Sequence, residues 1–303
     1  MSTDSEYGPA AYLCHQIVHQ MDRTSDGKKT VYKTEFNKLC FLAYNKLEED
    51  NEEVDLPLRW YQFGMEVCAP PGQLGVQFES DSRGTKVTPK SLSRSAFEIS
   101  GELRERIVQV AQRLANQYQH TYDTEEIVDE SYNEFAPTEF VSKFHEFRSV
   151  LDDLESGQPS LMAFDDSQSV DGHIETLRPH FEALVTSYPK DTYNEAYPEY
   201  RQWDSISRQL SKNGQIDQLK TFTAVFWEMF SRVELQVNHN ENIPASKKAE
   251  WIRGRDQERD NFAEVITEFR SIALDQYSDS SYLDDVAEQY SDVVRNIAQN
   301  VSE

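Results

Sequence analysis

Apolar residues recur at intervals of three and four positions over much of the chain, which is the spacing of an amphipathic helix. A first helix is expected from Pro9, since proline suits the first position of a helix. A second is expected from Thr34, whose hydroxyl can cap it. The same spacing predicts helices over residues 102–119, 124–135 and 138–154.

Apolar and polar residues alternate in one short part of the chain, as they do in a half-buried strand. Val76 and Phe78 have polar neighbours, and the alternation resumes at Thr85 after a polar, glycine-bearing loop. Two short runs around such a loop predict a β-hairpin. The aromatic segment 56–64, bounded by proline and glycine, is expected to be partly strand.

The order of these elements suggests a division of the chain. Two helices followed by a hairpin predict a winged-helix-like α+β unit, which with connecting helices covers residues 1–155. The polar, turn-rich stretch 156–171 predicts a linker. Residues 172–303 carry long apolar stripes that predict a C-terminal helical bundle, so the fold should be mainly α. The stripes cover residues 216–237, 262–272 and 283–301.

The charge balance is strongly acidic, with 54 Asp and Glu against 30 Lys and Arg and a net charge of −24. A disordered chain should lack aromatic residues, but here they make up 12%. The acid is therefore expected on the surface of a folded body. Self-repulsion of such a surface destabilises the fold at low ionic strength, and molar salt screens it. We interpret the composition as an adaptation to high salt.

The acidic residues are unevenly distributed. Residues 1–100 carry 11 basic and 15 acidic side chains, a net charge of −4, whereas residues 101–303 carry a net charge of −20. Such asymmetry is typical of a protein whose parts contact different partners.

The amino terminus lacks the basic and apolar regions of a secretory signal. No apolar run approaches the roughly 18 residues that a membrane span needs. Cys14, Cys40 and Cys68 are widely spaced and odd in number, so no disulfide framework is expected. These features predict a cytoplasmic protein without membrane contact.

One segment departs from the acidic character of the chain. Residues 82–97 contain no acidic side chain, although about one residue in six of the chain is acidic. The segment holds four cations, Arg83, Lys86, Lys90 and Arg94. Cations on and after a hairpin are suited to contact the phosphates of DNA. The alternative is that they pair with the acidic C-terminal half and dock the two domains.

Two other residue pairs have the spacing of a metal site or a catalytic site. His15 and His19 have the spacing of helical metal ligands, but Gln16 stands where a zinc protease needs a glutamate, and the apolar positions of the helix centre opposite them. We therefore expect the two histidines to face solvent, or another element laid over them, and to bind no metal. Arg232 and His239 match the Rx4–6H spacing of helical ribonuclease toxins, a spacing that chance alone produces about once in this composition. No phosphate-binding loop or nucleophile elbow is present, so neither a catalytic site nor a cofactor is expected.

Two short segments carry a family resemblance. The first, Thr34-Glu35-Phe36-Asn37-Lys38-Leu39-Cys40-Phe41-Leu42, is followed by Trp60-Tyr61-Gln62-Phe63-Gly64-Met65-Glu66-Val67. Over residues 34–69 the chain resembles the Panacea-type antitoxin domain, which has a KLxxLxY-like helix and then an aromatic segment ending in a W-x-x-YGPV-like turn. Met65 stands where that family usually has proline. The resemblance implies a module that binds and neutralises a partner protein such as a toxin, with Trp60, Tyr61, Phe63 and Gly64 as contact residues.

The sequence thus favours a non-enzymatic regulatory protein that binds a macromolecule through its N-terminal region. DNA is the first candidate, through Arg83, Lys86, Lys90 and Arg94. One alternative is an antitoxin-like protein that binds a partner protein through the C-terminal bundle or through residues 60–64. The other is a helical nuclease that uses Arg232 and His239.

Overall fold

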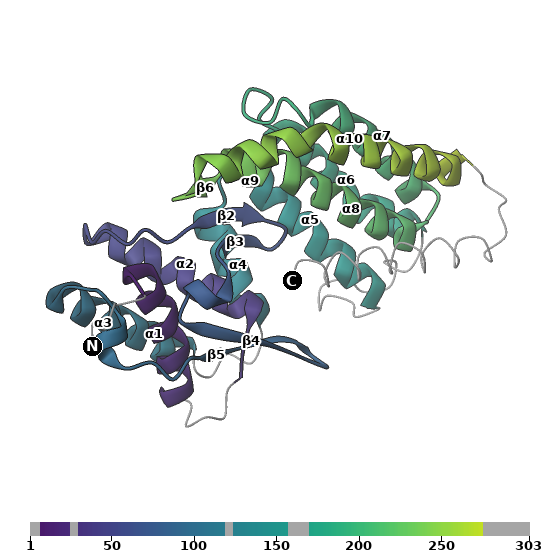
Figure 1. Ribbon diagram of the computed structural model, residues 1–303. Helices are drawn as coiled ribbons and strands as arrows, with labels where there is room; N and C mark the ends of the chain where they lie inside the picture. The colour runs from purple at the N-terminus through teal and green to yellow at the C-terminus, as the bar shows by residue number, and fades with distance from the viewer. Residues whose placement is uncertain (1–6, 25–29, 119–123, 157–169, 275–303) are drawn as a thin grey trace. The chain divides into compact units, whose positions relative to one another are not determined.

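Most helices and one β-hairpin form where the two periodicities predict them, and the fold is mainly α, with two small antiparallel sheets in the part of the chain that the structure describes. A computed structural model of the protein describes residues 7–24, 30–118, 124–156 and 170–274 (Figure 1). The chain divides into two compact units, and neither unit is continuous in sequence. Unit 1 comprises Met1–Ser142 and Ser231–Arg255, and unit 2 comprises Lys143–Phe230 and Asp256–Glu303.

Unit 1 contains both sheets. Its first stretch runs through α1 (Pro9–Thr24), β1 (Val31–Tyr32), α2 (Lys33–Glu49), β2 (Leu58–Tyr61), β3 (Gly64–Val67), the 3-10 turn η1 (Pro71–Gln73), β4 (Val76–Asp81), β5 (Gly84–Pro89), the 3-10 turn η2 (Arg94–Ala96), α3 (Gly101–Tyr118), α4 (Thr124–Phe135) and the start of α5 (Glu139–Ser156). Its second stretch adds the π-helical turn η3 (Ser231–Leu235), α9 (Gln236–Asn238), β6 (Asn240–Glu241) and the start of α10 (Ala245–Leu274).

The predicted hairpin is confirmed as β4 and β5, which pair from Val76↔Pro89 to Asp81↔Gly84. The short strand β1 adds to β5, so the sheet has the order β1-β5-β4. Both α1 and α2 lie against β5. These elements form a helical unit with a β-hairpin, as the sequence predicts, and between α2 and β4 the described chain forms β2 and β3 in place of a third α-helix.

The second sheet has the order β3-β2-β6. The aromatic segment forms β2, as expected in part, but the chain then turns back as β3, which the sequence analysis did not predict. The third strand, β6, comes from the second stretch of unit 1, where Asn240 pairs with Arg59 and Glu241 with Leu58. This sheet therefore joins segments that lie about 180 residues apart in the chain.

One local prediction in unit 1 was wrong. Helix α2 begins at Lys33, with Tyr32 at the N-cap position and no side-chain cap, so Thr34 lies inside the first turn. His15 is buried, at 8% exposure, whereas His19 is exposed as predicted. His15 is covered because its Nε2 is hydrogen-bonded to the carbonyl of Lys90 at 3.1 Å and its ring lies 5.3 Å from Phe97. His15 thus has another element laid over it, the second of the two predicted surroundings, although the periodicity of α1 does not indicate which segment this is.

Unit 2 is a helical bundle, as predicted. It consists of α5 from Lys143 on, α6 (Val170–Ser187), α7 (Tyr197–Lys212), α8 (Ile216–Phe230) and α10 from Asp256 on. Large aromatic side chains fill its core. The Phe144 ring stacks on Trp227 at 4.5 Å, and Phe222 stacks on Phe269 at 4.7 Å. The third predicted stripe, residues 283–301, lies outside the described residues.

The observed division of the chain differs from the predicted one. Residues 231–255 were expected in the C-terminal bundle, but they belong to unit 1, because β6 pairs with β2 and η3 packs on the same strand. The apolar stripe 216–237 is likewise not one regular helix, since α8 changes to π-helical geometry at Ser231. Most of the predicted linker, 156–171, lies outside the described residues.

Candidate functional site

The β2–β3 hairpin places a phenylalanine in a tight turn. Tyr61 and Gly64 form the closing pair, and Gln62 and Phe63 make the turn between them. Gly64 has a φ of +82°, in the left-handed region that favours glycine. Phe63 is 55% exposed and is one of few large apolar side chains so exposed in the described part of the chain.

Two hydrogen bonds from helices hold the backbone on either side of Phe63. The hydroxyl of Tyr132, on α4, donates to the carbonyl of Gln62 at 3.2 Å. The ammonium of Lys38, on α2, donates to the carbonyl of Met65 at 3.1 Å. The Tyr132 ring also meets the buried Trp60 edge-on, with 5.3 Å between the ring centroids. We call Lys38 and Tyr132 the turn clamp.

Gly64 lies close to both residues of the turn clamp. A Cβ atom at position 64 would stand 2.7 Å from Lys38 Nζ, 3.3 Å from the Trp60 ring and 3.4 Å from the Tyr132 ring. A contact of 2.7 Å is shorter than carbon and nitrogen tolerate, so any side chain here would displace the ammonium. The positive φ therefore favours glycine, and the close approach means that a side chain here would move the Lys38 ammonium from its position.

Lys38 is a charged residue in an apolar environment, only 1% exposed. Burial lowers the pKa of its ammonium to about 7, and the carboxylate of Glu66 opposes that shift. Its neighbour Asn37 accepts a hydrogen bond from the amide of Val67 at 3.3 Å. Met65 and Val67 are two positions apart on β3. The carbonyl of Met65 and the amide of Val67 therefore both point away from β2. Side chains of α2 thus cover the free edge of β3.

The other face of β2 is polar and lies against the second stretch of unit 1. Arg59 bonds Glu66 across the hairpin at 2.6 Å and donates to Gln236 Oε1 at 2.9 Å. Arg232 Nε donates to the hydroxyl of Tyr61 at 3.1 Å. The hairpin is therefore held on both faces, with Phe63 at its tip.

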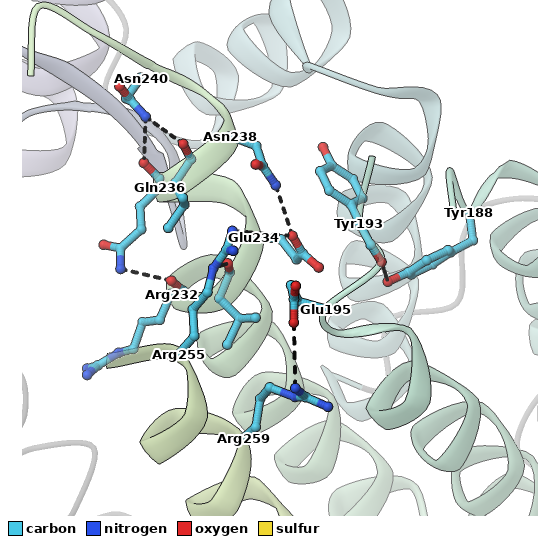
Figure 2. Close-up of polar contacts among 12 residues, drawn as sticks. Tyr188, Tyr193, Glu195, Arg232, Glu234, Gln236, Asn238, Asn240, Arg255 and Arg259 are labelled. Carbon is cyan, nitrogen blue, oxygen red and sulfur yellow. Dashed lines mark hydrogen bonds and ion pairs between the residues drawn. The ribbon is translucent and has the colours of Figure 1, made fainter. Parts of the chain in front are cut away.

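The π-helical turn that supplies Arg232 is stabilised from within unit 1 (Figure 2). Glu234 is fully buried, accepts a hydrogen bond from Asn238 at 2.9 Å and lies 3.9 Å from Arg255. Arg255 Nε also donates to the carbonyl of Val233 at 2.7 Å. π-helical turns often lie at functional sites, and this one orients Arg232 toward the hairpin.

Arg232 and His239, the residues of the nuclease alternative, are both part of this packing. Arg232 bonds Tyr61, and the carbonyl of His239 accepts the amide of Trp60 at 2.9 Å. Burial lowers the pKa of the His239 imidazole to about 4. A neutral imidazole at physiological pH fits a packed residue as well as a general base, so it does not favour catalysis.

The four cations of the basic segment have different surroundings. Arg83 is exposed at the tip of the β4–β5 hairpin, beside Asp81, and Arg94 is exposed in η2. Lys86 is half-buried and pairs in register with Glu79 on β4. Glu79 thus lies opposite the cation of β5 and Asp81 lies beside Arg83, so the hairpin is less basic than residues 82–97 alone.

Lys90 is held inside unit 1 instead. Its ammonium donates to the hydroxyl of Tyr7 and to the carbonyl of Gly72, both at 3.2 Å. The docking of these cations onto the C-terminal half remains a prediction, but the partners of Lys90 belong to its own unit.

The proposed partner-binding residues differ in their exposure to solvent. Trp60 is a core residue at 2% exposure, Tyr61 and Gln62 are half-buried, and Phe63 is exposed. No sequence pattern marks Tyr132 as part of the site, and Lys38 stands out in the sequence only within the antitoxin-like motif. A lysine within an apolar helical stripe was the one signal for its burial.

The described residues contain no group of three or more His, Cys, Asp or Glu placed to hold a metal ion. None of the described helices is long and apolar enough to cross a bilayer. Comparisons with protein-family models, with curated proteins and with solved structures gave no match.

Proposed function

We propose that this chain is a non-enzymatic regulatory protein that binds a partner protein through the turn at Phe63. The observation that carries this proposal is an aromatic side chain, 55% exposed, on a backbone fixed from two helices. A single exposed apolar residue is ordinary on a protein surface. An exposed aromatic residue on a rigidly held backbone is less ordinary. Because its backbone is already ordered before binding, association costs less conformational entropy.

The partner expected here is a protein with an apolar pocket that receives the phenyl ring. Aromatic anchors that fill such pockets dominate the free energy of many protein interfaces. The half-buried Tyr61 and Gln62 would lie at the edge of that contact. The antitoxin-like resemblance of residues 34–69 agrees with this kind of partner.

The test is site-specific photo-crosslinking in the native cells. A benzophenone-bearing phenylalanine analogue replaces Phe63 in one variant and Val185 in a control. Val185 is 51% exposed on α6, so it reports random collisions with an apolar surface residue. An adduct of one defined mass at position 63 and none at position 185 supports the proposal. No adduct at position 63, or the same adducts at both positions, refutes it.

DNA binding is the second candidate, and the exposure of Arg83 and Arg94 favours it. Each cation that contacts a phosphate should raise the salt dependence of binding by about one unit of slope. Fluorescence anisotropy with a mixed-sequence duplex, over a range of KCl concentrations, measures that slope. The double change Arg83→Gln/Arg94→Gln should lower it by about two, whereas Arg253→Gln, at an exposed cation of α10, should not. No binding by the unaltered protein at any salt concentration would exclude this candidate.

A further inference from the structure

Lys38 is an unexpected residue for its position. It is 1% exposed, and the Met65 carbonyl is the hydrogen-bond acceptor that its ammonium reaches in the described structure. No carboxylate forms an ion pair with it there, and Glu66 acts only at longer range. A buried ammonium with one acceptor is poorly compensated, because three N–H groups have left water.

Stability alone would favour another side chain at this position. Methionine has a similar length and no polar group, and apolar replacements of buried charges are often neutral or stabilising. What lysine adds is direction, since its ammonium must face an acceptor and so fixes the carbonyl that it reaches. That carbonyl belongs to Met65, two residues after Phe63.

The surroundings of the ammonium are built to keep this geometry. Gly64 leaves the space that Nζ occupies, and a Cβ there would stand 2.7 Å away. Tyr132 holds the carbonyl of Gln62 on the other side of Phe63. Lys38 and Tyr132 therefore fix the backbone immediately before and shortly after the exposed ring.

We propose that Lys38 is a positioning residue, which holds the Met65 carbonyl and thereby presents the Phe63 ring in the orientation that the partner binds. The inference rests on the proposed function of the turn. It adds that recognition depends on a buried residue that the partner does not touch.

The experiment compares Lys38→Met with the unaltered protein and with Leu39→Met. Leu39 is the next residue of α2, is 0% exposed, and is not part of the turn clamp, so its replacement controls for a general change in the core. Hydrogen exchange of the backbone amides from Tyr61 to Val67 reports the order of the turn, and photo-crosslinking at position 63 reports partner binding.

In Lys38→Met, the turn amides should exchange at least about tenfold faster, the loss expected for one hydrogen bond. The amides of α1 should be unchanged, and the crosslink yield should fall by a similar factor. Leu39→Met should keep both the turn exchange and the yield. Unchanged turn exchange, or a crosslink yield equal to that of the unaltered protein, would overturn the positioning role.

If Lys38→Met does not fold, Gly64→Ala tests the same contact from the other side, because its added methyl group meets Nζ. It should accelerate exchange at Met65–Val67 and lower the yield, and normal values of both would count against the role. The two proposals fail separately. No crosslink in the unaltered protein removes the proposed function, while the exchange rates still decide whether Lys38 orders the turn.

Discussion

Raising the pH from about 7 to about 8.5 should stabilise the folded protein, and Lys38 should be the cause. Its pKa is about 7 in the folded chain and about 10.4 in an unfolded chain. Between these values the unfolded state binds more protons, so the free energy of unfolding increases with pH. The gain is complete only above the unfolded pKa and is lost as the pH falls toward 7.

The size of this effect follows from the two pKa values. Each pKa unit corresponds to about 1.4 kcal/mol, and over this window the lysine should add about 1.5 kcal/mol to the free energy of unfolding. Burial raises the pKa values of the Cys40 and Cys68 thiols, which works in the opposite direction near pH 9 and sets the upper limit of the window. The histidines with lowered pKa values act below pH 7 and set its lower limit.

Urea denaturation at constant salt measures the effect. The free energy of unfolding should rise between pH 7 and pH 8.5 in the unaltered protein and stay nearly level in Lys38→Met. The difference between the two slopes isolates the lysine from every other titrating group. Equal slopes would show that the ammonium is not buried as described, and the reasoning about its charge would fail.

Four further predictions concern stability. Acidification from pH 6.5 toward pH 4 should destabilise the fold, because the pKa of His239 is depressed to about 4 in the folded chain. Partial exposure of the ring limits the loss in the free energy of unfolding to about 2 kcal/mol. Urea denaturation of His239→Gln should show a smaller loss. Gly64→Ala should cost about 2 kcal/mol or more in the same assay, from its positive φ and its contact with Lys38. Trp60→Ala should cost about 3–5 kcal/mol, whereas Phe63→Ser, at an exposed site, should change the free energy of unfolding by less than about 0.5 kcal/mol. Thermal melts should shift upward from about 0.1 M to molar KCl as screening becomes complete, and a melting temperature independent of salt would contradict the halophilic interpretation.

The sequence predicted the regular part of the fold because that part depends on local periodicity. The β4–β5 hairpin and helices such as α3 and α5 have a clear apolar pattern, and the bounds of these helices lie close to the predicted ones. The β2–β3 hairpin lacked such a signal, since its turn is Gln62-Phe63 and Gly64 comes only afterwards. The pairing of β6 with β2 depends on contacts between distant segments, which no local pattern encodes.

The candidate site was predicted in part for the same reason. Phe63 and Gly64 stood out only through the antitoxin-like resemblance, and the structure puts Phe63 on the surface. The inward position of Trp60 follows from strand alternation, which could have been applied to β2. The role of Tyr132 could not be predicted, because its hydroxyl reaches Gln62 only through tertiary packing.

The split composition of unit 1 has a consequence for how the protein is made. A ribosome has finished β2 long before it reaches β6, because Glu241 pairs with Leu58. At synthesis rates of about 5 to 20 residues per second, the wait is roughly 10 to 40 s. During that time one edge of β2 lacks its neighbouring strand β6. The free edge of β3 does not wait in this way, because α2, which covers it, has already been synthesised. Within this sheet the exposed strand edge of the nascent protein is thus limited to β2, and we expect chaperone binding or misassembly during translation at that edge.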